Sequence, residues 1–346
     1  MSAASYVIAA LGLAVLMVVH EAGHYFAARY FGMRVIKFSI GLGPTIVKHQ
    51  PAGSPTVFQI AIIPFLAYVQ IAGMNPYEEN DPEDKGSYAN ASLLGRIVTI
   101  SAGSAANYVF ASVLFFFGFM IGGRTIVDEQ SMRVVVAAEG PAKQADIRDG
   151  DKILSINGTA VPTWDALKKS ISAHPGETIE VVVERKDEKI TKSVTTGAVG
   201  TKYAGKILIG PEYRVVTVGP KEALGLAVTE PPQIVYGLLK GIAAMITRKE
   251  KAEVSGPVGI VRETAAAVQS GAGDTFKLLA AISAYLAGFN LLPFPALDGG
   301  RLIFLAFEAT ARRKPDQKVE LGVHAVGLLM LLTLIAVVTV KEVIFH

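Results

Sequence analysis

Cysteine is absent from the 346-residue sequence. Disulfide bonds, thiol catalysis and zinc sites built from cysteine are therefore excluded. Any transition metal that the chain binds must take histidine and carboxylate side chains as its protein ligands. The absence of cysteine does not identify the cellular compartment.

Charged residues are scarce. Lys, Arg, Asp and Glu make up 18% of the chain, whereas 51% of its residues are hydrophobic and its mean hydropathy is +0.41. These values are high for a soluble protein and typical of a chain that lies partly in a membrane. The net charge of +3 is too small to indicate a nucleic-acid partner. The composition therefore favours a lipid bilayer as the surroundings of part of the chain.

Two of only six histidines stand four residues apart, in His20-Glu21-Ala22-Gly23-His24. On an α-helix, positions i and i+4 share a face, so His20 and His24 can bind one Zn²⁺ ion from two sides. Glu21 is rotated off this face and suits a general base acting on a zinc-activated water better than a third ligand. The alternative is a pair of helix histidines that interact only with backbone or neighbouring side chains.

The histidine motif lies inside an apolar stretch, residues 6–28, that is long enough to span a bilayer. Ionisable side chains in a membrane helix are costly, which makes them functional candidates. The sequence therefore predicts a protease whose active site lies within the membrane. We expect this first helix to be retained, because no basic segment and no small-residue cleavage site precede the histidines.

The remaining apolar stretches suggest where a third zinc ligand lies. We expect them to form three further spans, at residues 97–122, 275–292 and 321–340. Basic clusters after the first and third spans put both chain ends outside. The first and third helices then run in the same direction, which brings Asp298 to the depth of His24. Asp298 is the best candidate for the third ligand. The alternative is that Asp298 is a cap or turn residue before glycines.

Between the first two spans, residues 38–44 and 57–63 read as two strands joined by a turn at 51–55. An apolar hairpin beside a membrane active site could enter the bilayer, and its free edge could pair with an extended substrate. A purely structural hairpin is the alternative. Within the second span, Asn107 follows a patch of small residues, and it could hydrogen-bond to the histidine helix or to neighbouring backbone.

The chain divides into four segments by composition. Residues 1–125 form the first part of the membrane domain, and 275–346 the second. Residues 126–216 have the charge, alternation and turns of one small soluble domain, with strands at 133–137, 153–156 and 178–184 and a helix at 164–173. We expect residues 217–274 to link the soluble domain to the second part of the membrane domain. This linker would contain an interfacial helix at 234–246, after two prolines, and a loop at 255–260. If 234–246 crossed the membrane, Asp298 would lie on the wrong side.

The sequence resembles the site-2 protease family of intramembrane zinc metalloproteases, in particular its bacterial RseP-like members with a PDZ domain. Two motifs carry the resemblance: the H-E-x-x-H sequence at 20–24 and Asn290-Leu291-Leu292-Pro293-Phe294-Pro295-Ala296-Leu297-Asp298-Gly299, which is similar to the family's N-x-x-P-x-P-x-L-D-G signature. Supporting similarities lie at 38–44, at Gly103 with Asn107, and at 255–260. Residues 140–158 are similar to a bacterial PDZ domain.

The resemblance implies a set of site residues. His20, His24 and Asp298 would bind Zn²⁺, Glu21 would be the catalytic acid and base, and Asn290 would hold substrate or stabilise the oxyanion. Besides Asn290, three residues would contact substrate. They are Gly41 and Gly43 of a membrane-reentrant hairpin, and Asn107 of the second span.

The expected fold is therefore a polytopic α-helical membrane protein with about four transmembrane helices, a membrane-associated β-hairpin and an inserted α+β PDZ domain. By resemblance it would reside in the bacterial inner membrane, with the PDZ domain outside and the active site near the cytoplasmic side.

The expected function is regulated intramembrane proteolysis of single-span proteins already cut outside the membrane. Anti-sigma factors or signal-peptide remnants would be such substrates, and the PDZ domain would bind peptide tails or exclude bulky substrates. The alternative is a non-catalytic PDZ-bearing scaffold with a structural metal. A transporter is a further alternative, but it predicts more ionisable residues within the spans.

Overall fold

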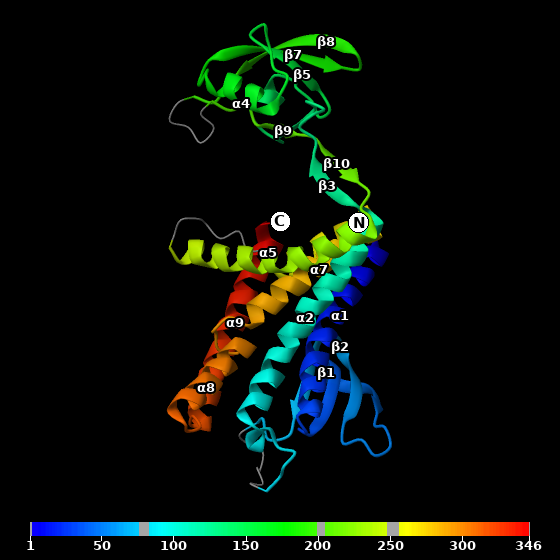
Figure 1. Cartoon of the computed structure of the whole chain (residues 1–346), viewed down its shortest axis with the longest axis vertical. Helices are drawn as coiled ribbons and strands as arrows, with labels where there is room; N and C mark the ends of the chain where they lie inside the picture. Colours follow the sequence, from blue (N-terminus) through cyan, green and yellow to red (C-terminus); the bar gives the residue numbers. More distant parts are fainter. Residues whose placement is uncertain (1, 76–82, 199–204, 248–255, 346) are drawn as a thin grey trace. The chain divides into compact units, whose positions relative to one another are not determined.

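The computed structural model describes residues 2–75, 83–198, 205–247 and 256–345. The chain forms two compact units (Figure 1). Met1–Gly122 and Val218–His346 make the helical unit, and Gly123–Thr217 makes the inserted unit. Most of the acidic segment 75–84, the basic cluster 248–251 and Ser255 lie outside the described residues.

The described part of the helical unit contains three helices that are long and apolar enough to cross a membrane: Ala3–Tyr30, Leu93–Gly122 and Lys318–Ile344. The first two are α1 and α2, and the third lies within α9 (Gln317–Phe345). The stretch expected to form another span, 275–292, is helical in α7 (Ala272–Asn290), which packs along α2. The four-span arrangement stays a prediction.

Helix α2 is the centre of the helical unit, because α1, α7, α5 (Pro220–Ile246) and α8 (Asp298–Ala311) all pack against it. Small residues permit this close packing. A Cβ atom added to Gly122 on α2 would lie 2.8 Å from the Cα atom of Gly273 on α7. The buried hydrophobic residues at the centre come from α1, α2, α5 and α7: Leu16, Leu114, Phe115, Phe119, Ala223, Ala227, Leu279 and Ala280.

The segment after the inserted unit differs from the sequence-based expectation. Helix α5 begins at Pro220 and continues through Pro231 and Pro232, whereas the expected helix began after these prolines. Each proline removes one backbone hydrogen bond, but its φ angle suits a helix. Burial of Ala223 and Ala227 against α2 favours the longer helix.

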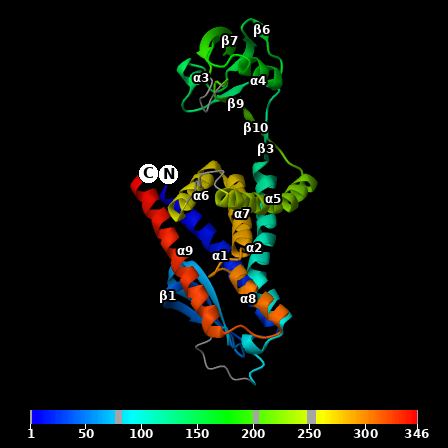
Figure 2. The same ribbon diagram turned by 90° about the vertical axis from the view of Figure 1, so that its left-hand side faces the viewer.

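Two further helices differ from the sequence-based expectation. Helix α6 (Pro257–Ser270) begins inside the expected loop 255–260, with Pro257 in its first turn. Proline is favoured there because the first helical N–H groups have no intrahelical partner. Helix α9 reaches α6 near its own C-terminal end (Figure 2). Glu342 of α9 accepts a hydrogen bond of 2.5 Å from the N–H of Gly256, the residue before α6. Helix α8, which begins at Asp298, was not expected.

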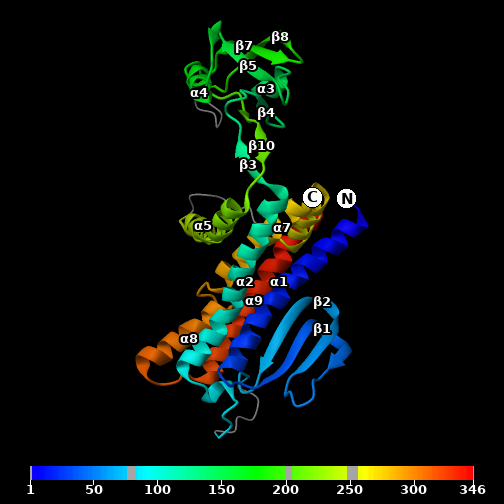
Figure 3. The same cartoon turned by 45° about the vertical axis from the view of Figure 1, so that its right-hand side comes forward.

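The expected hairpin is present and is longer than predicted. Strands β1 (Val35–His49) and β2 (Val57–Ile71) pair with each other, and β2 lies along α1 (Figure 3). Phe38 of β1 pairs with both Phe58 and Val69 of β2, so residues 37–40 have strand partners on both sides. In the part of the chain that the structure describes, residues 67–69 have strand partners only in β1 and form an edge of this sheet.

The inserted unit is a small α+β structure. Its four-stranded sheet has the order β6 (Thr159–Ala160), β5 (Lys152–Ile156), β7 (Thr178–Arg185) and β8 (Glu188–Thr195). Trp164, Leu167 and Ile171 of α4 (Trp164–Ser172) pack on it. Its other elements are β3 (Arg124–Val127), β4 (Val134–Val136), α3 (Pro141–Gln144), β9 (Ile209–Pro211) and β10 (Tyr213–Val216). Strands β3 and β10, at its two ends, pair antiparallel.

Candidate metal centre

Helix α1 holds His20 and His24 one turn apart on a buried face. His20 is 6% and His24 is 9% exposed, and the Nε2 atoms of the two rings lie 3.2 Å from each other. The i, i+4 spacing that the sequence indicates therefore brings both ring nitrogens to one point.

Helix α8 supplies a carboxylate to the same point. Oδ2 of Asp298 lies 3.3 Å from Nε2 of His20 and 3.4 Å from Nε2 of His24. Zinc lies about 2.0–2.2 Å from such nitrogen and oxygen ligands, so the corners of its tetrahedron are about 3.3–3.5 Å apart. The three side chains therefore have the spacing of three zinc ligands, and a fourth position is left for water or substrate.

Hydrogen bonding around these atoms also fits a cation. Nδ1 of His24 lies 2.8 Å from the carbonyl oxygen of Thr99, which can only accept, so Nδ1 carries the proton and Nε2 of a neutral ring presents its lone pair. Oδ2 of Asp298 is buried and accepts no hydrogen bond from the residues that the structure describes. A buried carboxylate oxygen beside imidazole nitrogens, without a donor of its own, is well matched to a metal ion.

Asn107 of α2 is fully buried, and its side-chain amide lies 3.4 Å from Nδ1 of His20. The amide nitrogen is the atom placed towards the ring, while Oδ1 is buried without a partner. The two amide atoms can exchange places by a rotation. If Nε2 of His20 binds metal, Nδ1 carries the proton, and the rotated amide oxygen accepts it.

Close packing between α1 and α2 sets the position of both histidines. A Cβ atom on Gly103 of α2 would overlap Nε2 of His24, and one on Gly23 of α1 would overlap the carbonyl oxygen of Ala102. Only glycine fits at these two contacts. The small-residue patch expected in the second span thus adjoins the imidazole rings.

Glu21 lies next to the edge of the hairpin. Its Oε2 accepts a hydrogen bond of 3.0 Å from the backbone N–H of Val69. Among the described residues, 67–69 have strand partners only in β1, and this edge of β2 lies beside the histidine helix.

Three other predicted site residues are not joined to this cluster. Asn290 is the last residue of α7, and among the described residues no hydrogen bond connects it with the three ligands. Gly41 and Gly43 lie in β1 with positive φ angles of 98° and 92°. Their expected roles in substrate binding stay predictions.

The sequence analysis did not identify two supporting groups. The carbonyl of Thr99 has no sequence signal, because every residue carries one. His324 of α9 accepts a hydrogen bond of 2.9 Å from the N–H of Ala296, in the loop before Asp298. A lone histidine in an apolar helix is a signal of function, and it could have drawn attention to His324.

Comparison with known proteins agrees with this chemistry. The profile of peptidase family M50 matches residues 8–334. Three similar curated proteins carry the name "Putative zinc metalloprotease". The Nostoc sp. protein is 34% identical over 95% of this chain and 93% of its own length. The Synechocystis sp. protein is 34% identical over 97% of this chain and 93% of its own length. The Clostridium acetobutylicum protein is 31% identical over 100% of this chain and 99% of its own length.

Proposed function

The chain belongs to peptidase family M50 and is both a zinc metalloprotease of the site-2 type and a membrane protein, and we propose that it cleaves transmembrane segments of single-span proteins within the bilayer. The observation that carries this proposal is the convergence of His20, His24 and Asp298 on one buried point at mutual distances of 3.2–3.4 Å. His20 and His24 lie on α1, a helix apolar enough to cross the membrane.

Each residue has a distinct chemical task. Zinc, when bound by the three side chains, supplies Lewis acidity that activates water and polarises a carbonyl group. Glu21 takes a proton from the attacking water and delivers it to the leaving nitrogen, so that the amide bond breaks into a carboxylate and an amine. The N–H of Val69 holds Oε2 of Glu21, which leaves Oε1 for proton transfer. Asn290 is proposed to donate a hydrogen bond to the carbonyl oxygen.

The edge of β2 is suited to present the substrate. Transmembrane segments are helical, and their amides are reached only when the helix opens into an extended strand. In the described part of the chain, residues 67–69 pair only with β1, and the N–H of Val69 on their other side binds Glu21. Pairing there would hold any extended sequence by its main chain. We propose that Gly41 and Gly43 of the neighbouring strand keep the sheet in the shape that this pairing needs.

The proposed topology has four spans, α1, α2, α7 and α9. Both chain ends lie at the same end of the helical unit, which agrees with an even number of crossings (Figure 1). Basic residues after the first and third spans then assign the opposite end to the cytoplasm of a bacterial inner membrane. His24 lies toward the C-terminal end of α1, so cleavage would occur near the cytoplasmic side.

The proposed substrates have already lost their bulky extracytoplasmic parts to a first protease, as anti-sigma factors or signal-peptide remnants would. The inserted unit is proposed to be an extracytoplasmic PDZ domain. A PDZ domain there would bind peptide tails along a strand edge or exclude large substrates.

The alternative function is a PDZ-bearing membrane scaffold with a structural metal. A structural zinc site normally has four protein ligands. Among the described residues, three side chains converge as ligands, and the adjacent carboxylate of Glu21 is bound to Val69 instead. The arrangement favours a catalytic site.

The test combines cleavage with metal content in proteoliposomes. The probe is a single-span peptide with short tails and a fluorophore on its cytoplasmic side. Wild type should cleave it and hold one zinc per chain, Glu21→Gln should keep the zinc without cleaving, and His24→Ala should lose both. Cleavage by Glu21→Gln at the wild-type rate would contradict the assignment of the general base. Zinc retained by His24→Ala would contradict the metal site.

A further inference from the structure

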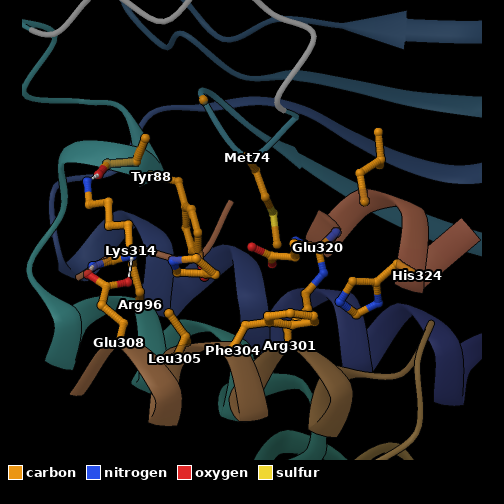
Figure 4. Close-up of a pocket in the computed structure, with 14 residues that line it drawn as sticks. Met74, Tyr88, Arg96, Arg301, Phe304, Leu305, Glu308, Lys314, Glu320 and His324 are labelled. Atoms are coloured by element: carbon orange, nitrogen blue, oxygen red, sulfur yellow. Dashed lines mark hydrogen bonds and ion pairs between the residues drawn. The ribbon is translucent and has the colours of Figure 1, made fainter. Parts of the chain in front are cut away.

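A buried ion pair joins α2 to α8 at a distance from the metal centre. Arg96 donates from Nη1 and Nη2 to the two carboxylate oxygens of Glu308, at 2.8 and 2.6 Å (Figure 4). The side chains are 8% and 13% exposed. Both hydrogen bonds are charge-assisted and parallel, so the pair fixes orientation as well as distance.

On α2, Arg96 shares a face with the groups that position the histidines. Arg96, Ile100, Gly103 and Asn107 follow the spacing i, i+4, i+7 and i+11, and all are buried. Gly103 contacts the imidazole rings, Asn107 reaches His20, and Thr99 on the adjoining position accepts from His24. The ion pair is therefore anchored to the helix surface that holds two of the three metal ligands.

On α8, Glu308 shares a face with the third ligand. Asp298, Leu305 and Glu308 follow the spacing i, i+7 and i+10, and Leu305 between them is buried. Ten residues of helix place Asp298 and Glu308 about 15 Å apart along the axis. Asp298 thus lies at the start of α8, and the ion pair fixes the part of the same helix around Glu308 to α2.

We propose that Arg96 and Glu308 are positioning residues that hold Asp298 in register with His20 and His24. This inference rests on the proposed zinc site. A tilt of α8 by about 2° about Glu308 would displace Asp298 by about 0.5 Å, and metal–ligand distances tolerate only about 0.2 Å. The ligands lie on α1 and α8, which are far apart in sequence and both pack on α2. The ion pair between α2 and α8 therefore determines whether Asp298 reaches the two histidines.

The first experiment measures zinc affinity by chelator competition in the detergent-solubilised full chain. Glu308→Gln and Arg96→Lys should each weaken zinc binding about tenfold, the lower end of the loss caused by removing groups that orient metal ligands. The matched control is Arg185→Gln, which removes another bidentate pair, that of the partly buried Arg185 with the buried Asp151 in the inserted unit. It should leave zinc affinity unchanged.

A second measurement separates positioning from simple stabilisation. The chain has no cysteine, so Leu94→Cys on α2 and Ile303→Cys on α8, both exposed positions, give two spin labels on a clean background. The distance distribution between them should be narrow in the wild-type background and should broaden in Glu308→Gln. The double variant Arg96→Lys/Glu308→Gln should bind zinc no more weakly than the worse single variant, because the two residues act as one unit.

Two results would overturn the inference. One is wild-type zinc affinity in Glu308→Gln and Arg96→Lys, with zinc lost in His24→Ala; the metal site would then stand without the positioning pair. The other is a lowered thermal stability of the metal-free variants with unchanged zinc affinity and an unchanged label distance, which a merely structural pair would give. If His24→Ala binds zinc like wild type, the metal site itself has failed.

Discussion

The side-chain amide of Asn107 lies 3.4 Å from Nδ1 of His20, while Nε2 of the same ring lies 3.3 Å from Oδ2 of Asp298. One imidazole thus connects α2 with α8. Asn107 can orient the ring and fix its tautomer, in line with the hydrogen bond to the histidine helix that the sequence suggested. The substrate contact that the resemblance implies for Asn107 stays a prediction.

Replacement of Asn107 by leucine should weaken zinc binding by about 10–100-fold, because Nδ1–H of His20 would lose its buried acceptor. Chelator competition measures the effect. Ser104→Ala is the control, since Ser104 is a buried neighbour on α2 whose hydroxyl has no hydrogen-bond partner. Equal zinc affinity in Asn107→Leu and Ser104→Ala would refute the role of Asn107.

A single methyl group at Gly103 should abolish zinc binding, because it would overlap Nε2 of His24 and Cε1 of His20. Metal analysis of purified Gly103→Ala measures this. Gly322→Ala on α9 is the matched control, since a Cβ atom there has no neighbour within 4 Å. Retention of one zinc per chain in Gly103→Ala would mean that the helices separate without cost to the site.

The hairpin can be tested separately from the metal. Gly41 has φ +98°, and a Cβ atom there would lie 2.8 Å from the carbonyl oxygen of Ile63. Gly41→Ala should therefore distort the sheet and slow cleavage of the single-span peptide at least tenfold, with zinc content unchanged. Gly53→Ala, also at positive φ but without neighbours within 4 Å, is the control. If both variants cleave at one rate, Gly41 has no special part in substrate binding.

The inserted unit should lose stability in acid through Asp151. Burial alone would raise the pKa of this carboxyl, but hydrogen bonds from Arg185 and from the N–H of Arg148 outweigh burial and lower the pKa below its ordinary value of 3.8. The folded state therefore favours the carboxylate. Its contribution to stability is fully present above about pH 4, the unfolded value, and is lost as the pH falls through the lower folded value.

Trp164 makes this measurable in the full chain. It is the only tryptophan, and it is buried in the core of the inserted unit. Its fluorescence should report unfolding of this unit alone. Arg185→Gln should lower the unfolding free energy at pH 7 by about 3 kcal/mol, because it leaves the buried carboxylate of Asp151 without its cationic partner. Lys168→Gln, whose ion pairs are exposed and 4.0 Å long, should change nothing measurable. Equal stability of the two variants would contradict the prediction.

The convergence of the three candidate ligands could be predicted because each residue's place follows from a local or topological rule. His20 and His24 share a helix face by spacing alone. Asp298 required a further step, in which the direction of two helices was inferred from basic clusters. The structure brings its carboxylate within 3.4 Å of both rings.

The parts that could not be predicted depend on packing between distant segments. Nothing in the sequence joins Arg96 to Glu308, which lies 212 residues further along the chain. Pro231 and Pro232 indicated a helix start, yet burial of α5 against α2 carries the helix through them. The hydrogen bond from Val69 to Glu21 depends on the fold of the hairpin.

The paired strands β3 and β10 make the inserted unit an exchangeable cassette. Val127 and Tyr213 are direct partners across this ribbon, so the chain leaves and re-enters it at neighbouring points. A tight turn could join these two residues, and α2 would then lead to α5 by a short hairpin. Genetic loss, duplication or replacement of the cassette would leave the order and direction of the surrounding helices unchanged. Selection can therefore alter the inserted unit through one gene segment and preserve the candidate metal centre in the others.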